Sequence, residues 1–165
     1  MNRRAAINLQ GDSMGNSSIS DPLRFAVWHR DNWVCRFCGS PVFFSPTLKL
    51  LDKLSPGHGS YHQHGWQGKM LDLLGNKCAA AHHVDPRSKG GPSTEANLVT
   101  ACMQCTMTIG DSGKKPEPGI TNHSAKMTNW DGLSTLYPRL AGILAEKENK
   151  WIKIIQRYYD LPSKA

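Results

Sequence analysis

The chain has 165 residues, 39% of them hydrophobic, and a net charge of +7. The length suggests one domain with appendages, and the hydrophobic share allows only a small core. No apolar run approaches the roughly 18 residues of a membrane span, and no secretory signal is visible, so we expect a cytoplasmic protein without a membrane partner. The positive charge favours a polyanionic partner, of which nucleic acid is the simplest; a basic surface without a partner is the alternative.

The N-terminal part is predicted to be a polar tail followed by a helix. Residues 1–19 are rich in Ser, Gly and Asn, which indicates a mobile tail. Ser20 or Asp21 then caps a helix that has Pro22 at its first position. Apolar residues along one side of this helix predict that it packs on the core.

Between about residues 40 and 76 the pattern predicts an insert with two helices. Residues 41–44 look extended, and Ser45-Pro46 starts a helix that carries several leucines. A loop with a Pro-Gly turn follows over residues 55–68. Residues 69–74 then predict a short helix, for which Gly75 supplies the stop.

The rest of the chain predicts a strand, an irregular loop and C-terminal helices. Residues 79–84 predict the strand, residues 85–96 form a loop too irregular for a tight hairpin, and residues 97–101 begin a helix or lead into one. Residues 111–129 are polar and rich in proline, which predicts a linker or arm. Residues 130–165 are expected to form a C-terminal helical extension, because apolar residues recur there at helical spacing.

Five cysteines are present, and four of them form two Cys-x-x-Cys pairs. Cys35 and Cys38 make the first pair, and Cys102 and Cys105 make the second. In a chain without a secretory signal, such pairs indicate metal binding rather than disulfides. Four thiolates around one tetrahedral ion form a closed structural site that suits Zn²⁺, whereas four buried free cysteines are the alternative. Cys78 is left over and is expected to be a small buried residue.

A histidine pair and an asparagine lie between the two cysteine pairs. Together with the sequence around them they form an ordered set of motifs: Arg30-Asp31, the first cysteine pair, His82-His83-Val84, Pro86-Arg87-Ser88, Gly90-Gly91, Asn97-Leu98-Val99 and the second cysteine pair. This set, over about residues 23–110, resembles the HNH endonuclease family.

The resemblance implies an α+β fold. Its centre would be a small ββα-metal nuclease core around one divalent cation, stapled by a four-cysteine zinc site and flanked by N- and C-terminal helices. The nuclease domain would span residues 20–110, with the insert at about 40–76. The implied activity is hydrolysis of phosphodiester bonds, usually in DNA.

The candidate catalytic residues are His83 and Asn97. Phosphodiester hydrolysis needs an activated water and a cation that absorbs negative charge. A neutral imidazole near pH 7 can take a proton from water, so His83 is the candidate general base. The amide of Asn97 can bond two backbone groups at once, and the resemblance implies that it positions the loop that carries the histidine.

His82 and Thr106 stand where the resemblance implies ligands of a catalytic cation, Mg²⁺ or Mn²⁺. Most relatives have aspartate in place of His82, and a softer histidine ligand lets other divalent ions compete with Mg²⁺. Most have Asn or His in place of Thr106, and a hydroxyl is a weaker donor. Three alternatives therefore stay open: Thr106 serves together with water and substrate phosphate, Asp85 or His123 replaces it, or the site is impaired.

Three functions compete on these grounds. The first is a metal-dependent endonuclease that acts on DNA, with Arg87 and Lys89 as candidate phosphate contacts or as simple solvated charge. The second is a zinc-stapled nucleic-acid-binding module that has lost catalysis. The third is a subunit that docks a protein partner through its C-terminal helix, whose face carries Trp151, Tyr158 and Tyr159.

Overall fold

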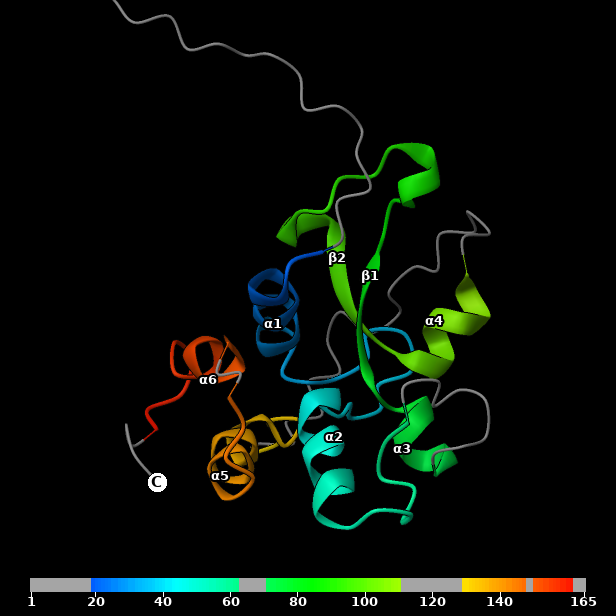
Figure 1. The fold of residues 1–165 in the computed structure, drawn as a ribbon. Helices are drawn as coiled ribbons and strands as arrows, with labels where there is room; N and C mark the ends of the chain where they lie inside the picture. Colours follow the sequence, from blue (N-terminus) through cyan, green and yellow to red (C-terminus); the bar gives the residue numbers. More distant parts are fainter. Residues whose placement is uncertain (1–18, 63–70, 111–128, 148–149, 162–165) are drawn as a thin grey trace, which may run out of the picture.

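The computed structural model describes residues 19–62, 71–110, 129–147 and 150–161 (Figure 1). All but the last residue of the expected tail, and all but the last residue of the expected linker, lie outside these ranges. The described part mixes helices with one two-stranded antiparallel sheet, which confirms the α+β class.

Helix α1 (Asp21–Arg30) begins where the capping pattern predicted. The hydroxyl of Ser20 accepts a hydrogen bond from the backbone N–H of Leu23 at 3.4 Å, and proline stands in the first turn. Both features satisfy or remove backbone donors that a helix start leaves open. Phe25, Val27 and Trp28 are buried on the side of α1 that faces the core.

The sheet pairs β1 (Ala79–His83) with β2 (Leu98–Cys102), and Ala79 lies opposite Cys102 while His83 lies opposite Leu98. Residues 97–101 had been predicted to begin a helix or to lead into one. Residues 98–101 do not begin a helix; they belong to the fully buried strand β2, which leads directly into helix α4 (Met103–Ile109), so the second alternative is confirmed. The hydrogen bonds to β1 make this segment a strand. The sequence does not reveal the strand, because a strand buried on both faces lacks the alternation of apolar and polar residues.

A buried carboxylate fixes α1 to the sheet. Asp31, directly after the helix, accepts a hydrogen bond from the N–H of Thr100 at 2.7 Å. Arg30 donates to Asp31 at 3.0 and 3.2 Å, and also to the carbonyls of Glu95 at 2.7 Å and Leu98 at 2.8 Å. A buried carboxylate needs such partners, so this network fixes how the helix end sits on β2.

Helices α2 (Ser45–Leu54) and α3 (Asp72–Asn76) build the insert. The first starts at Ser45 as predicted. The second begins later than residue 69 and continues through Gly75, so the expected stop was wrong. Asp72 occupies the first turn, where a negative charge complements the helix dipole, and the N–H of Lys77 closes the end on the carbonyls of Gly75 and Leu74.

The C-terminal residues form η4 (Ser134–Leu136), α5 (Tyr137–Ile143) and α6 (Lys150–Ile155). They share the main core with α1 and the first cysteine pair. Trp151 is buried edge-on against Phe44, with ring centroids 4.9 Å apart, and the indole N–H of Trp33 donates to the hydroxyl of Tyr159 at 3.0 Å. The face considered for a protein partner therefore packs largely against the body of the protein.

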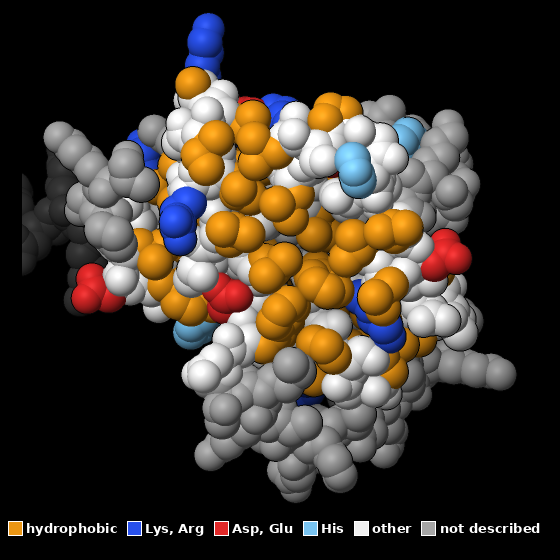
Figure 2. Space-filling model, turned by 90° about the horizontal axis from the view of Figure 1, so that it is seen from below, with side chains coloured by type: hydrophobic (Ala, Val, Ile, Leu, Met, Phe, Trp, Pro, Cys, Tyr) orange, Lys and Arg blue, Asp and Glu red, His pale blue; other side chains and the backbone are white. Residues whose placement is uncertain are grey.

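The lower end of the molecule carries a band of hydrophobic side chains (Figure 2). Helices α2, α3 and α5 lie at this end in Figure 1, and each contributes an exposed apolar residue: Leu54, Leu73 and Ile143. Ile143 belongs to the apolar residues that recur at helical spacing in the C-terminal part, yet 70% of it is exposed.

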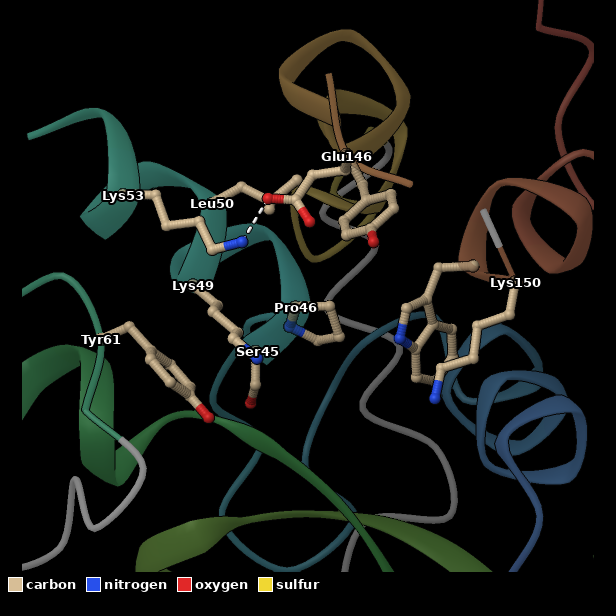
Figure 3. Close-up of a pocket in the computed structure, with 10 residues that line it drawn as sticks. Ser45, Pro46, Lys49, Leu50, Lys53, Tyr61, Glu146 and Lys150 are labelled. Atoms are coloured by element: carbon tan, nitrogen blue, oxygen red, sulfur yellow. Dashed lines mark hydrogen bonds and ion pairs between the residues drawn. The ribbon is translucent and has the colours of Figure 1, made fainter. Parts of the chain in front are cut away.

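A pocket of about 240 Å³ lies between α2 and the C-terminal helices, and three lysines help to line it: Lys49, Lys53 and Lys150 (Figure 3). Lys53 pairs with Glu146, and Lys150 pairs with Asp21 at 3.2 Å. Two of these lysines are thus engaged by carboxylates. Helix α2, which lines the pocket, lies near the Ala79 end of β1 rather than the His83 end (Figure 1).

None of the described helices combines the length and the apolar character that crossing a bilayer requires.

A tight segment at residues 130–133 joins the C-terminal helices to the first cysteine region. The carbonyl of Gly132 accepts from the N–H of Phe44 at 2.8 Å, and the indole of Trp130 donates to the carbonyl of Val42 at 2.9 Å. Gly132 has φ +68°, and a Cβ at this position would lie 2.3 Å from a ring carbon of Trp33. Only glycine fits this close approach.

We predict that Gly132→Ala lowers the free energy of unfolding by about 3 kcal/mol, because the added methyl overlaps a buried ring at a left-handed backbone position. Gly142→Ala is the matched control: nothing lies within 4 Å of its Cβ position, and we expect a stability gain of up to about 1 kcal/mol. Urea denaturation measures both. Equal stability of the two variants would contradict the close packing of Gly132.

Candidate functional site

The four paired cysteines converge on one point. The sulfur atoms of Cys35, Cys38, Cys102 and Cys105 all lie within 4.8 Å of one another, and those of Cys38 and Cys102 are 3.8 Å apart. A tetrahedron with metal–sulfur bonds of about 2.3 Å has edges of about 3.8 Å, so the cluster has the dimensions of a four-thiolate site. The donor set fits a structural metal such as zinc.

Backbone hydrogen bonds shape both halves of this cluster. The N–H of Cys35 donates to the carbonyl of Ser40, and the N–H of Gly39, at φ +69°, donates back to the carbonyl of Cys35, both at 2.9 Å. The N–H of Arg36 donates to the carbonyl of Thr100 at 2.8 Å, which ties this turn to β2. Cys102 ends β2 and also caps α4, because its sulfur accepts from the N–H of Cys105 at 3.4 Å.

The pKa values of three of these thiols are shifted, and not all in the same direction. Burial raises the pKa of Cys35 and of Cys105. Burial would also raise the pKa of Cys38, but hydrogen bonds from the side chain and backbone of Ser40 outweigh it and lower that pKa to about 6. A divalent cation would favour the thiolate form at all four positions. Cys78 is buried outside the cluster, as expected.

Asn97 clamps the loop between the two strands. Its side-chain oxygen accepts from the N–H of Asp85 at 2.8 Å, and its side-chain nitrogen donates to the carbonyls of Asp85 at 3.1 Å and Pro92 at 2.9 Å. One buried amide thus makes three backbone hydrogen bonds, one more than expected. It joins Asp85, two residues after the end of β1, to Pro92, seven residues further along the loop.

The two glycines of the loop are required for this clamp. Gly90 has φ +85° and ends the short helix η2 (Arg87–Lys89). A Cβ on Gly91 would lie 1.8 Å from the carbonyl oxygen of Asp85 and 3.0 Å from the Asn97 nitrogen. The loop therefore closes over Asn97 only with glycine at this position.

His83 is the last residue of β1 and faces the clamped loop. Its Nε2 lies 3.0 Å from the hydroxyl oxygen of Ser93. Partial burial lowers the pKa of His83, and the positive charges of Arg87 and His82 lower it further. The imidazole is therefore neutral near pH 7, the form that can accept a proton.

His82 contacts a different part of the structure. Its ring packs edge-on against Phe37, inside the first cysteine pair, with centroids 5.4 Å apart. Neighbouring residues of a strand point to opposite faces, so the two histidines diverge. Thr106 lies in α4, which packs against both strands, and its hydroxyl oxygen is buried without a hydrogen-bond partner among the described residues. An unsatisfied buried hydroxyl is costly, and Trp28, Arg36 and Ser134 also have a buried polar atom without a partner.

The remaining candidates from the sequence are two phosphate contacts and two alternative cation ligands. Arg87 and Lys89 are exposed on η2, and the charge of Arg87 acts on His83. Asp85 is exposed, with its backbone held by Asn97, and His123 lies outside the described residues. Within the described part of the chain, no second group of three or more His, Cys, Asp or Glu residues gathers as the cysteines do. Ser93 was not singled out from the sequence, where a serine after Gly-Gly-Pro gives only a turn signal.

The strands, the clamped loop and α4 together form a ββα unit with a metal-binding cysteine cluster at its base. Residues 71–111, which span this unit, match the family model described as HNH endonuclease. Over this segment the chain is similar to the HNH endonuclease family, as the motif set predicted. The first cysteine pair lies outside the matched segment. No curated protein and no solved structure matches the chain.

We predict that the purified protein holds one zinc ion per chain, measured by elemental analysis. Cys102→Ser should lower metal affinity by more than about 100-fold and lower the melting temperature, because it removes one of the four thiolate ligands. Cys78→Ala, which changes a buried cysteine outside the cluster, should keep the metal. A Cys102→Ser protein with full zinc content would show that the cluster does not bind the ion.

Proposed function

We propose that this protein is a metal-dependent HNH endonuclease that hydrolyses DNA phosphodiester bonds, with His83 as the general base. The observation that carries the proposal is the placement of His83: the last residue of β1, neutral near pH 7, at the edge of a loop that Asn97 holds rigid. A base fixed on a rigid element can reach a bound water in a repeatable geometry.

The imidazole of His83 would take a proton from a water molecule as the water oxygen bonds to phosphorus and the bond from phosphorus to the leaving oxygen breaks. Its lowered pKa keeps most of the base in the proton-accepting form at neutral pH. Asn97 acts indirectly, because it bonds only the backbone and so fixes the geometry rather than touching the substrate.

His82 and Thr106 would hold the catalytic cation, Mg²⁺ or Mn²⁺. A bound divalent cation supplies positive charge that stabilises the negative charge developing on the phosphate and on the leaving oxygen. The buried, unpartnered hydroxyl of Thr106 supports an oxygen ligand in α4. An imidazole ligand at His82, in place of a carboxylate, supports a preference for Mn²⁺ or another softer ion over Mg²⁺.

The charge of the protein suits a nucleic-acid substrate. A net charge of +7 attracts a polyanion, and Arg87 and Lys89 offer exposed cations on the loop that follows His83. We propose that these two side chains contact backbone phosphates on either side of the bond that is cut, which positions the strand without reading its sequence.

The second candidate function is a zinc-stapled nucleic-acid-binding module without catalysis. Thr106 favours it, because a hydroxyl replaces the stronger Asn or His donor that the family resemblance implies. The two functions share the fold and the cysteine cluster, so only an activity measurement separates them.

We predict that the protein nicks or cuts supercoiled plasmid DNA with Mg²⁺ or Mn²⁺, and that His83→Ala lowers the rate by about 10²- to 10⁴-fold through loss of the general base. His58→Ala, an exposed histidine in the α2–α3 loop, is the matched control and should keep full activity. Binding of DNA without cleavage by wild type and His83→Ala alike would favour the binding module. A parallel RNA substrate tests the choice of nucleic acid.

Thr106 gives a separate prediction about the cation. Thr106→Val keeps the side-chain shape but removes the hydroxyl, and should raise the cation concentration for half-maximal cleavage by about 10- to 100-fold. Thr106→Asn should preserve or raise activity and shift the preferred metal. Thr108→Val, on the exposed side of α4, serves as the control. Unchanged metal dependence in both Thr106 variants would exclude Thr106 as a ligand.

A further inference from the structure

Ser93 is the side chain that touches the proposed base. Its hydroxyl oxygen lies 3.0 Å from Nε2 of His83, ten residues away in the sequence. The other ring nitrogen, Nδ1, has no hydrogen bond to any described residue. One edge of the imidazole is therefore occupied by a hydroxyl, and the other edge remains for water or substrate.

The clamp of Asn97 holds both partners of this contact. The Asn97 amide bonds the carbonyl of Pro92, directly before Ser93, and also the N–H and carbonyl of Asp85, two residues after His83. Gly91 packs against the Asp85 carbonyl from within the same loop. The distance between the serine hydroxyl and the histidine ring is thus set by one buried side chain that touches neither of them.

We propose that Ser93 is a positioning residue that accepts a hydrogen bond from Nε2–H of His83 and thereby makes Nδ1 the nitrogen that receives the proton. This rests on the proposed function. A neutral imidazole has one N–H donor and one bare acceptor. Because Ser93 already occupies the Nε2 edge, water can approach only Nδ1, and Nδ1 accepts a proton only if Nε2 carries the hydrogen.

The same arrangement suits the charged state of the ring. When water gives a proton to Nδ1, both ring nitrogens carry hydrogen, and the Nε2–H···Oγ bond becomes charge-assisted and stronger. The serine oxygen is already the acceptor, so nothing in the protein needs to turn as the charge forms. If Ser93 instead donated to Nε2, neither nitrogen could serve as a base in this position.

The tautomer is measured directly by long-range ¹H–¹⁵N correlation spectra of the full chain labelled at histidine, at a pH where the ring is neutral. We expect wild-type His83 to carry hydrogen on Nε2, and Ser93→Ala to give a mixture of the two tautomers. For plasmid cleavage, Ser93→Ala should lower kcat by about 10- to 100-fold with KM unchanged, the effect of losing a hydrogen bond to a charged group. Ser93→Thr, which keeps the hydroxyl, should restore both signals.

Ser88→Ala, an exposed serine in the same loop, is the matched control and should change neither signal. A hydrogen on Nδ1 in wild type, or a Ser93→Ala protein with wild-type tautomer and kcat, overturns the inference. If His83→Ala is inactive while Ser93→Ala is fully active, the nuclease stands and the role of Ser93 fails. If wild type cleaves nothing but Ser93→Ala changes the tautomer, the nuclease proposal fails and the hydrogen-bond assignment stands.

Discussion

The convergence of four sulfurs on one point is the constraint on which the rest of the domain depends. It joins a turn near residue 35 to the end of β2, and Cys102 is at once the last residue of the strand and the cap of α4. A metal held there fixes the angle between the sheet and the helix. The core of the described residues is small, so a cross-link of this kind replaces much of what a larger apolar interior would supply.

His83 and Asn97 lie at the other end of the sheet from Cys102. There the ordering comes from Asn97, whose three backbone bonds close the loop over two glycines. Polar groups that are buried and fully satisfied favour one geometry strongly, because each alternative leaves an unpaired donor or acceptor. The cysteine cluster therefore sets the frame, and Asn97 sets the fine position of His83 and Ser93 within it.

Thr106, like Trp28, Arg36 and Ser134, has a buried side-chain polar atom without a hydrogen-bond partner among the described residues. Its hydroxyl is inside the protein without a partner, on the helix that packs against the strand of His82. Stable proteins keep such groups rare, and violations concentrate at functional sites. The same residue is the clearest departure from the family pattern. If Thr106 binds the catalytic cation, the cation satisfies the buried hydroxyl and also completes the nuclease site.

The sequence alone determined the features whose cause is local or whose spacing is distinctive: the Ser20 cap of α1, the start of α2 at Ser45, the strand that ends in the histidine pair, and the metal-binding use of the cysteines. Only the tertiary structure decided that residues 98–102 form a strand, that the C-terminal helices share the core of α1, and that Ser93 meets His83. These depend on contacts between residues far apart in the chain. The local conformational preferences of residues do not predict such contacts, because hydrogen-bond partners and packing surfaces are brought together only when the chain folds.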